Sequence, residues 1–220
     1  MIVVIVAGGD IDIEFTRGFI NEWDESSLFI IACDRGYEAC EAMGIKPDLV
    51  VGDFDSADNG CYERAVATGI EVRKLNPVKD DTDAEAALDI AFTRTTENDD
   101  IYLLGATGIR IDHLLGNIGL IGKGLKNHRA VKLVDFHNYI EMIEPGETYV
   151  LHRDNQFGKY VSVYPFMSQV KGLNMKGFKY PVENGNIDGF STLTISNELV
   201  ADSGEISIQE GYLIVMQTRD

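Results

Sequence analysis

Leu49-Val50-Val51-Gly52-Asp53-Phe54-Asp55-Ser56 is a short apolar run that leads directly into two acids separated by one residue. In an extended segment, residues two apart point to the same side, so Asp53 and Asp55 can present both carboxylates to one small volume. Two like charges that close repel unless a metal or a basic partner compensates them, and carboxylate oxygens suit Mg²⁺. The same pattern also occurs where a strand simply turns into a surface loop, so the motif needs support from the rest of the chain.

Apolar and amphipathic runs alternate over the first 135 residues. The apolar runs predict strands at Ile2–Ala7, Leu28–Cys33, Leu49–Val51, Ile70–Leu75, Ile101–Leu104 and Ala130–Asp135, of which the first two are expected to be buried. Helices are predicted at Tyr37–Met43, Asp83–Thr95 and Asp112–Lys126, and the stretch Asn59–Thr68 is amphipathic. Near-continuous apolar strands separated by helices indicate an α/β unit with a parallel sheet covered on both faces.

Glycines and acids follow the predicted strands at the points where these strands end. They are Gly8-Gly9-Asp10, Asp34, the pair Asp53 and Asp55, and the loop from Gly105 to Asp112. The carboxyl ends of parallel strands lie at one edge of the sheet, and open α/β sheets bind their ligands at that edge. We therefore expect these residues to share one site.

The stretch Lys79-Asp80-Asp81-Thr82-Asp83 precedes a predicted helix. Thr82 with Glu85 fits a capping box, in which the Thr hydroxyl accepts a backbone N–H of the first helical turn. Capping explains the threonine and one acid. It leaves the other acids and the lysine as candidate ligands of a metal ion and of phosphate.

Gly105-Ala106-Thr107-Gly108-Ile109-Arg110-Ile111-Asp112-His113 joins a predicted strand to a predicted helix. A glycine-bearing loop with free N–H groups suits phosphate, while Arg110 can pair with phosphate oxygens and Asp112 with a metal. The alternative is a glycine turn with Asp112 as a helix cap. The loop matches neither a Walker sequence nor a dinucleotide fingerprint.

The composition is that of an acidic globular protein. Asp and Glu number 36 against 19 Lys and Arg, which gives a formal net charge of −17, so we expect neither nucleic acid nor membrane as a partner. Cys33, Cys40 and Cys61 show no Cys-X-X-Cys spacing, which argues against structural zinc and a disulfide framework. The apolar start Met1–Ala7 is too short for a membrane span or a signal peptide. We therefore expect a cytoplasmic protein.

The second part of the chain changes to short strands with polar alternation and turn residues. Strands are predicted at Tyr139–Ile143, Thr148–His152, Tyr160–Tyr164, Leu193–Ser196, Glu205–Gln209 and Tyr212–Gln217. This pattern predicts an all-β, sandwich-like C-terminal domain. We therefore place an α/β domain at residues 1–138 and an all-β domain at residues 139–220.

The motifs Gly52–Ser56, Lys79–Asp83 and Gly105–His113, in this order, resemble the thiamine pyrophosphokinase family. Gly177-Phe178-Lys179-Tyr180-Pro181 and Thr194-Ile195-Ser196-Asn197-Glu198 resemble its two C-terminal signatures, so the likeness extends over nearly the whole chain. One departure lies at Ala32–Gly36, where family members usually show Ala-Asp-Gly-Gly and this chain places Arg35 after Asp34. A second is Ile109, which replaces a glycine.

The resemblance implies transfer of the terminal diphosphate of ATP to the hydroxyl of thiamine, giving thiamine diphosphate and AMP, with Mg²⁺ required. It also implies a homodimer, with thiamine between the nucleotide domain of one subunit and the β domain of the other. The residues implied in catalysis are Asp53, Asp55, Asp83 and Asp112, which with Asp80 also form the implied metal site. The nucleotide would contact Asp34, Lys79, Asp80, Gly105, Thr107, Arg110 and His113. Thiamine would contact Tyr180, Ser196 and Asn197.

Two other functions are compatible with the residues. A strand followed by Asp-X-Asp also occurs in Asp-nucleophile phosphohydrolases, although there the pair follows the first strand. A non-catalytic nucleotide sensor, with the β domain as its interaction surface, is the second alternative. Products formed from ATP and thiamine distinguish all three.

Overall fold

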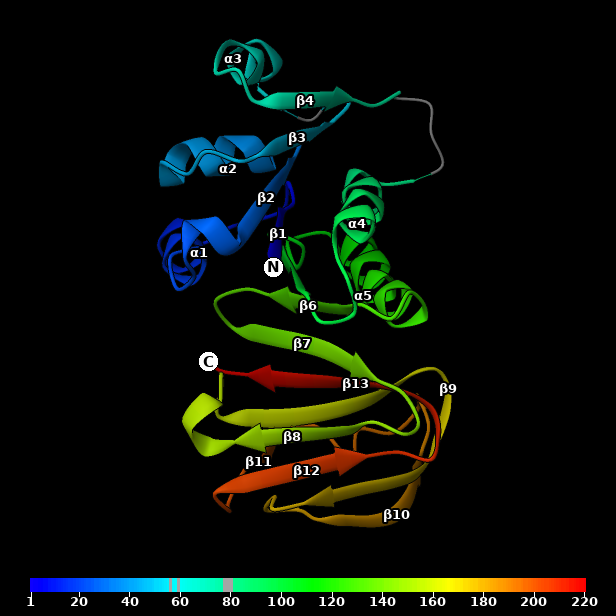
Figure 1. The fold of residues 1–220 in the computed structure, drawn as a ribbon. Helices are drawn as coiled ribbons and strands as arrows, with labels where there is room; N and C mark the ends of the chain where they lie inside the picture. The colour runs from blue at the N-terminus through cyan, green and yellow to red at the C-terminus, as the bar shows by residue number, and fades with distance from the viewer. Residues whose placement is uncertain (56, 59, 77–80) are drawn as a thin grey trace. The chain divides into compact units, whose positions relative to one another are not determined.

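The strands expected from the apolar runs form a parallel sheet in the computed structural model, which describes residues 1–55, 57–58, 60–76 and 81–220 (Figure 1). The strands are β1 (Ile2–Val6), β2 (Leu28–Cys33), β3 (Leu49–Gly52), β4 (Glu71–Lys74), β5 (Asp100–Leu104) and β6 (Ala130–Val134). Their lateral order is β4-β3-β2-β1-β5-β6, and each neighbouring pair is parallel. Residues from Val3 to Val6 and from Leu49 to Val51 have no exposed surface, which explains why their sequence is continuously apolar.

Helices cover both faces of this sheet. They are α1 (Ile13–Ile20), α2 (Gly36–Met43), α3 (Cys61–Ala67), α4 (Asp83–Arg94) and α5 (Ile111–Lys126). Figure 1 shows α1 and α2 on one side of the central strands and α4 and α5 on the other. Helix α1 was not predicted from the sequence. Its signal is Asp12, whose side chain accepts from the backbone N–H of Phe15 at 2.8 Å and caps the helix.

The strand order reverses between β1 and β5, which is the topological switch point of the sheet. The loops that follow these two strands touch through their backbones, since the N–H of Gly9 donates to the carbonyl oxygen of Gly105 at 2.9 Å. A Cβ atom at Gly9 would lie 2.4 Å from that oxygen, so only glycine fits there. The glycines after β1 and β5 therefore allow two loops to meet at the ligand-binding edge.

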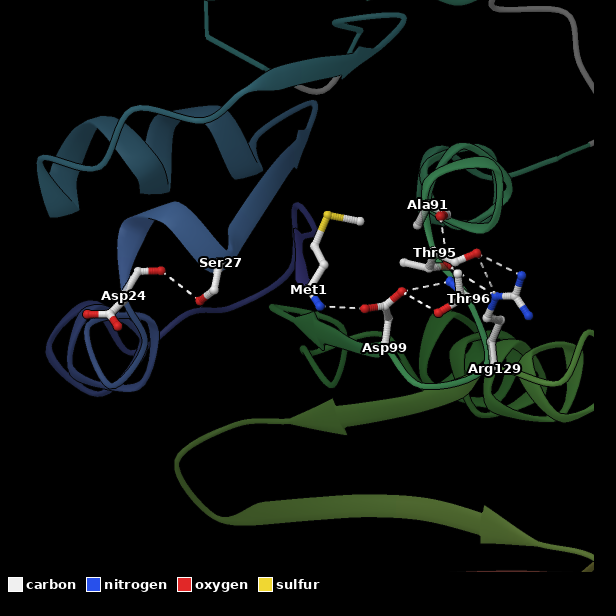
Figure 2. A network of polar contacts seen from close by, with 8 residues as sticks. All are labelled: Met1, Asp24, Ser27, Ala91, Thr95, Thr96, Asp99 and Arg129. Atoms are coloured by element: carbon white, nitrogen blue, oxygen red, sulfur yellow. Dashed lines mark hydrogen bonds and ion pairs between the residues drawn. The ribbon is translucent and has the colours of Figure 1, made fainter.

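The opposite edge, at the amino ends of β1 and β5, is closed by paired polar groups (Figure 2). Arg129 donates through Nη2 and Nε to the carbonyl oxygen of Thr95 at 2.7 and 3.1 Å. The backbone N–H and the hydroxyl of Thr96 donate to Asp99 Oδ2 at 2.7 and 2.8 Å, and the terminal amine of Met1 pairs with the other carboxylate oxygen. These contacts join the loop before β5 to the start of the chain and to the loop before β6.

The chain divides into two compact units, Met1–Phe136 and His137–Asp220. The second unit contains β7 (Asn138–Ile143), β8 (Thr148–His152), β9 (Tyr160–Lys176), β10 (Val182–Ile187), β11 (Asn197–Glu198), β12 (Ser203–Ser207) and β13 (Glu210–Thr218). They pair in the order β7-β13-β9-β12-β8, with β10 and β11 also on β9, and every pair is antiparallel. Buried aliphatic side chains such as Val163, Leu173 and Ile206 form its core.

One strand prediction in this unit was confirmed but ended too early, and another was wrong. The predicted strand Tyr160–Tyr164 continues to Lys176 as a strand of 17 residues, and Leu193–Ser196 is a turn that precedes the short β11. Strand β9 pairs with β13 and β11 in its first half and with β12 and β10 in its second. Its buried face changes along the way, so the sequence does not show one alternating pattern.

In the described part of the chain, no helix has the length and apolar character that a membrane span requires.

Candidate active site

Three acidic side chains of the first unit meet at the carboxyl edge of the sheet. Asp34 follows β2, Asp53 follows β3, and Asp83 is the first residue of α4. Each offers a carboxylate oxygen, and these oxygens all lie within 4.8 Å of one another. Asp34 is only 5% exposed, and the other two are half-buried. Hard divalent cations such as Mg²⁺ take this kind of ligand, so the group is a candidate metal site.

The backbone holds Asp34 in an unusual conformation. Its φ is 50°, in the left-handed region that Asp tolerates better than most residues. Its N–H donates to the carbonyl oxygen of Val51 at 3.0 Å, and its own carbonyl oxygen accepts from the N–H of Tyr37 at 3.0 Å. Gly52 lies directly alongside, where a Cβ atom would come within 3.2 Å of the Asp34 side chain. These contacts fix the end of β2 against the end of β3, and Arg35 does not displace the acid.

Asp53 and Asp55 are not presented by an extended segment as the sequence suggested. Strand β3 ends at Gly52, and Phe54 has a φ of 65°, so the alternation of a strand does not continue through the motif. The N–H of Asp55 donates to Asp53 Oδ1 at 3.1 Å. Asp53 belongs to the three-acid group, whereas Asp55 is exposed and lies outside it.

Asp83 is placed by the start of α4. The expected cap is present, since the N–H of Glu85 donates to Thr82 Oγ1 at 3.2 Å. The Cys33 thiol donates to the carbonyl oxygen of Asp83 at 3.7 Å, which ties the end of β2 to the first turn of the helix. Lys79 and Asp80, the other candidates of this stretch, lie outside the described residues.

Asn117, which no motif predicted, supports the glycine loop after β5. Asn117 on α5 is buried, and its Nδ2 donates to the carbonyl oxygen of Ala106 at 2.7 Å. Gly105 has a φ of 65°, and Thr107 is half-buried in the same loop. The available signal for Asn117 was a polar residue between Leu114 and Ile121, on the apolar face of the helix.

Arg110 and Asp112 contact each other rather than the three-acid group. Nε and Nη2 of the guanidinium donate to Oδ1 and Oδ2 of the carboxylate at 3.2 and 2.6 Å. The Arg110 guanidinium, aided by the backbone N–H of His113, holds the pKa of Asp112 at about 2. Both side chains are well exposed, at 69% and 66%, and His113 is exposed beside them. The pair is therefore open to a ligand that competes for either partner.

A second group of possible ligands, Glu38, Asp58 and Cys61, is already engaged with protein groups. Glu38 accepts the backbone N–H of Asp58 at 2.7 Å, and Arg64 donates to Asp58 at 3.0 Å. Burial raises the pKa of the Cys61 thiol to about 11, so the sulfur keeps its proton at neutral pH. Arg64 already compensates the charge of Asp58, so this group is a weaker candidate for a metal than the three-acid group.

In the second unit, Asn197 supports Tyr180. The Asn197 amide is buried, with Oδ1 accepting from the N–H of Tyr180 at 3.0 Å and Nδ2 donating to its carbonyl oxygen at 2.8 Å. Tyr180 is 60% exposed, and the Lys179 ammonium lies 5.5 Å from the centroid of its ring. Ser196 has a φ of 60°, and its N–H donates to the Ser162 hydroxyl at 2.8 Å. A buried amide thus fixes the backbone of the residue that carries this exposed ring.

Comparison with known proteins confirms the resemblance seen in the motifs. A family model described as thiamin pyrophosphokinase, catalytic domain, matches residues 19–133, and one described as thiamin pyrophosphokinase, vitamin B1 binding domain, matches residues 148–213. The thiamine pyrophosphokinase of Bacillus subtilis (strain 168) is 38% identical over 197 residues, covering 90% of either chain. The crystal structure of thiamine pyrophosphokinase from Bacillus subtilis matches with a TM-score of 0.88 and 36% identity, covering 100% of both chains. That of thiamin pyrophosphokinase from Geobacillus thermodenitrificans matches with a TM-score of 0.84 and 35% identity, covering 100% of this chain and 98% of the other.

The matched segments contain both groups of site residues. The catalytic-domain match includes the three-acid group and the loop that carries Arg110 and Asp112. The vitamin-binding match includes Tyr180 and Asn197. Motif order, site geometry, sequence identity and fold agree over both units, and the chain belongs to the thiamine pyrophosphokinase family.

Proposed function

We propose that the chain transfers the diphosphate group of ATP to the hydroxyl of thiamine, giving thiamine diphosphate and AMP, and that the reaction takes place at Asp34, Asp53 and Asp83. The observation that carries this assignment is the meeting of three carboxylates at the ligand-binding edge of the sheet, within the segment matched to the catalytic domain. Residues 1–138 act as the catalytic domain. Residues 139–220 act as the thiamine-binding and dimerisation domain of a homodimer.

The donor set fits Mg²⁺. Three carboxylates whose oxygens lie within 4.8 Å of one another repel in the absence of a cation, and oxygen ligands suit this ion. Mg²⁺ bound there supplies the positive charge that offsets the phosphates of ATP. Asp34, Asp53 and Asp83 hold the ion. Asp55, Asp80 and Asp112 are further proposed ligands, drawn in once the nucleotide is bound.

The glycine loop and Arg110 receive the nucleotide. The loop from Gly105 to Thr107 offers backbone N–H groups, and Arg110 offers a guanidinium that suits phosphate oxygens in a bidentate contact. A triphosphate carries more negative charge than the Asp112 carboxylate, so it competes for Arg110 and releases Asp112 toward the metal. Lys79 and His113 are the remaining proposed contacts of the nucleotide.

Tyr180 and Ser196 receive thiamine, and Asn197 positions Tyr180. The exposed ring already has the Lys179 ammonium 5.5 Å from its centroid, so a cation can lie against it. Replacing Tyr180→Ala should raise the KM for thiamine by about tenfold with the KM for ATP unchanged. The matched variant Tyr180→Phe keeps the ring and should change neither by more than about twofold. Equal effects of the two variants would remove the ring from the thiamine site.

The test of the function is an incubation of the purified protein with Mg²⁺, ATP and thiamine, with all nucleotides and thiamine species quantified. We expect AMP and thiamine diphosphate to appear one-for-one, only when thiamine and Mg²⁺ are both present. ADP or free phosphate instead of AMP would favour a phosphohydrolase. Nucleotide binding without turnover would favour a sensor, and either result would overturn the proposal.

A further inference from the structure

The second unit contains a pocket of about 380 Å³ that the proposed function does not use. It lies between the loop from Arg153 to Lys159, the end of β11 and the end of β13. Charged and apolar groups share its wall, among them Arg153, Phe157, Lys159, Glu198, Leu199 and Arg219. Its volume falls within the range of small-molecule sites.

The charge of this pocket is opposite to that of the chain. Three cationic side chains and one carboxylate line it, although the whole chain has a formal net charge of −17. The one carboxylate, Glu198, is offset by Lys179, whose ammonium lies 2.9 Å from its Oε1. That contact also holds the pKa of Glu198 below its ordinary value, so the pair stays formed at neutral pH. We propose that this pocket is a binding site for a small anion that carries phosphate.

Uncharged groups contact two of the three cations. Arg153 Nη2 donates to the carbonyl oxygen of Ala201 at 2.7 Å, and the Arg219 guanidinium lies 4.6 Å from the centroid of the Phe157 ring. Within the described residues, no salt bridge joins Arg153 or Lys159 to a carboxylate. Arg153 is therefore fixed without neutralisation, so it loses less freedom on binding and keeps its charge for a ligand.

The loop that supplies these residues is itself braced. Gln156 Nε2 donates to the carbonyl oxygens of Gly158 and Lys159 at 2.6 and 3.2 Å, and the N–H of Phe157 donates to Gln217 Oε1 at 2.8 Å. Gly158 is buried against the backbone of Thr218, where a Cβ atom would lie 2.4 Å from the carbonyl carbon. The wall of the pocket is therefore largely formed before a ligand arrives.

Phosphate fits this pocket better than the other charged groups of the reaction. Two guanidinium groups and an ammonium match the oxygens of phosphate or diphosphate, whereas they repel the positively charged thiamine. The three-acid group in the first unit has the opposite charge and needs a metal before it can hold phosphate. Metal-free conditions therefore separate this pocket from the three-acid group, and the positions of the amides that shift separate it from the loop of Arg110.

The test is a titration of the ¹⁵N-labelled full chain with sodium pyrophosphate in buffer that contains EDTA. We expect saturable shifts of the backbone amides of Gly158, Lys159 and Leu199. The double variant Lys159→Gln/Arg219→Gln should bind at least about tenfold more weakly, because each cation contributes a charge-assisted contact. Lys176→Gln removes one positive charge from an exposed position of β9 and is the control, with unchanged affinity expected.

Two further titrations distinguish this pocket from the three-acid group and from unspecific attraction of anions. Asp53→Asn should bind pyrophosphate as the natural sequence does, so failure of the catalytic proposal leaves this one standing. Succinate should bind at least about tenfold more weakly than pyrophosphate, since carboxylates carry less charge per group. Equal binding of succinate, unchanged affinity in the double variant, or no saturable shift up to millimolar pyrophosphate would each overturn the proposal. The single variant Lys159→Gln, at an exposed position, provides the same comparison should the double variant not fold.

Discussion

Acidic residues lie at both edges of the parallel sheet, but their partners differ between the two edges. At the amino edge, Asp99 accepts from Thr96 and pairs with the amine of Met1, and these contacts lower its pKa to about 2 (Figure 2). At the carboxyl edge, Asp34 and Asp53 approach each other and Asp83 within 4.8 Å. The first arrangement stabilises the fold, and the second brings together like charges, which repel one another.

Acids lie at both edges, so their position at the end of a strand does not show whether they serve the fold or the reaction. The groups that each acid contacts do show it. An acid whose neighbours are donors contributes to stability. An acid whose neighbours are other acids needs a cation, and the backbone must hold it there. Substitutions at the carboxyl edge should therefore change the rate, and substitutions at the amino edge should change the stability.

The largest effect is expected from Asp53→Asn at the carboxyl edge. The substitution removes a charge from the three-acid group, so kcat for AMP formation should fall by about 10³-fold, or about 4 kcal/mol in activation free energy. Initial rates at saturating ATP and thiamine measure it. The fold should be retained, because the lost charge also relieves repulsion.

The matched control is Asp24→Asn in the same unit. Asp24 is exposed, and its carbonyl oxygen rather than its side chain accepts the Ser27 hydroxyl (Figure 2). This variant loses the same charge and should keep its activity within about twofold. If Asp53→Asn retained more than a tenth of the rate, the three-acid group would not be the reaction centre.

A smaller effect, on stability instead of rate, is expected from Arg129→Ala at the amino edge. The substitution leaves the buried Thr95 without the donors that its carbonyl oxygen now has, so the free energy of unfolding should fall by about 2 kcal/mol. Denaturant unfolding followed by the fluorescence of Trp23, the only tryptophan, measures the first unit. Trp23 suits this purpose because its ring packs 5.1 Å from that of Tyr102 on β5.

Arg129→Lys keeps the charge but not the forked donors, and its stability should fall between those of Arg129→Ala and the natural sequence. The kcat of Arg129→Ala should equal that of the natural sequence wherever the protein is folded. If Arg129→Ala lost as much of its kcat as Asp53→Asn, the proposed difference between the two edges would be wrong.

Metal binding provides a third comparison of the edges. If Mg²⁺ binds the folded chain and not the unfolded chain, it should raise the free energy of unfolding. The gain should be about 1.4 kcal/mol when the free Mg²⁺ concentration is ten times the dissociation constant. The Trp23 unfolding curve with and without Mg²⁺ measures the gain. It should disappear in Asp83→Asn and persist in Arg129→Ala. A gain that persists in Asp83→Asn would place the metal elsewhere.

The carboxyl edge was largely predictable from the sequence because strands buried on both faces are continuously apolar. Their ends are then visible, and Asp34, Asp53 and Asp83 follow from those ends and from a capping signal. The resemblance to the family supplied the substrates, which the residue chemistry alone did not.

The contacts that support the site were not predictable, since they depend on side chains brought together by the fold. Asn117 and Asn197 each bond to a backbone group from another part of the chain, and no local pattern shows which group that is. The pairing of Arg110 with Asp112 depends on the backbone between them and on rotamers. The long β9 changes partners along its length, which removes the alternation that sequence reading uses.

The smallest expected effect concerns Asp112, which lies at the carboxyl edge but has a basic partner like the acids of the amino edge. Its pKa is about 2 because of Arg110, so Arg110→Gln should return that pKa toward the ordinary value of an aspartate. Carboxyl ¹³C chemical shifts measured against pH follow it. The pKa of Asp99 serves as an internal control and should stay at about 2.

The sign of the pH dependence follows from the direction of this shift. Because the folded pKa of Asp112 is lowered, the pair contributes stability above the ordinary pKa, and that contribution is lost as the pH falls toward about 2. Both side chains are exposed, so the loss should be small and should shrink further in salt. Metal-free ATP provides a second measurement on the natural sequence. If its phosphates bind Arg110 in place of Asp112, the pKa of Asp112 should rise as it does in Arg110→Gln. If neither Arg110→Gln nor metal-free ATP changed the pKa of Asp112, Arg110 would not be the partner that lowers this pKa, and it would not move from Asp112 to the nucleotide.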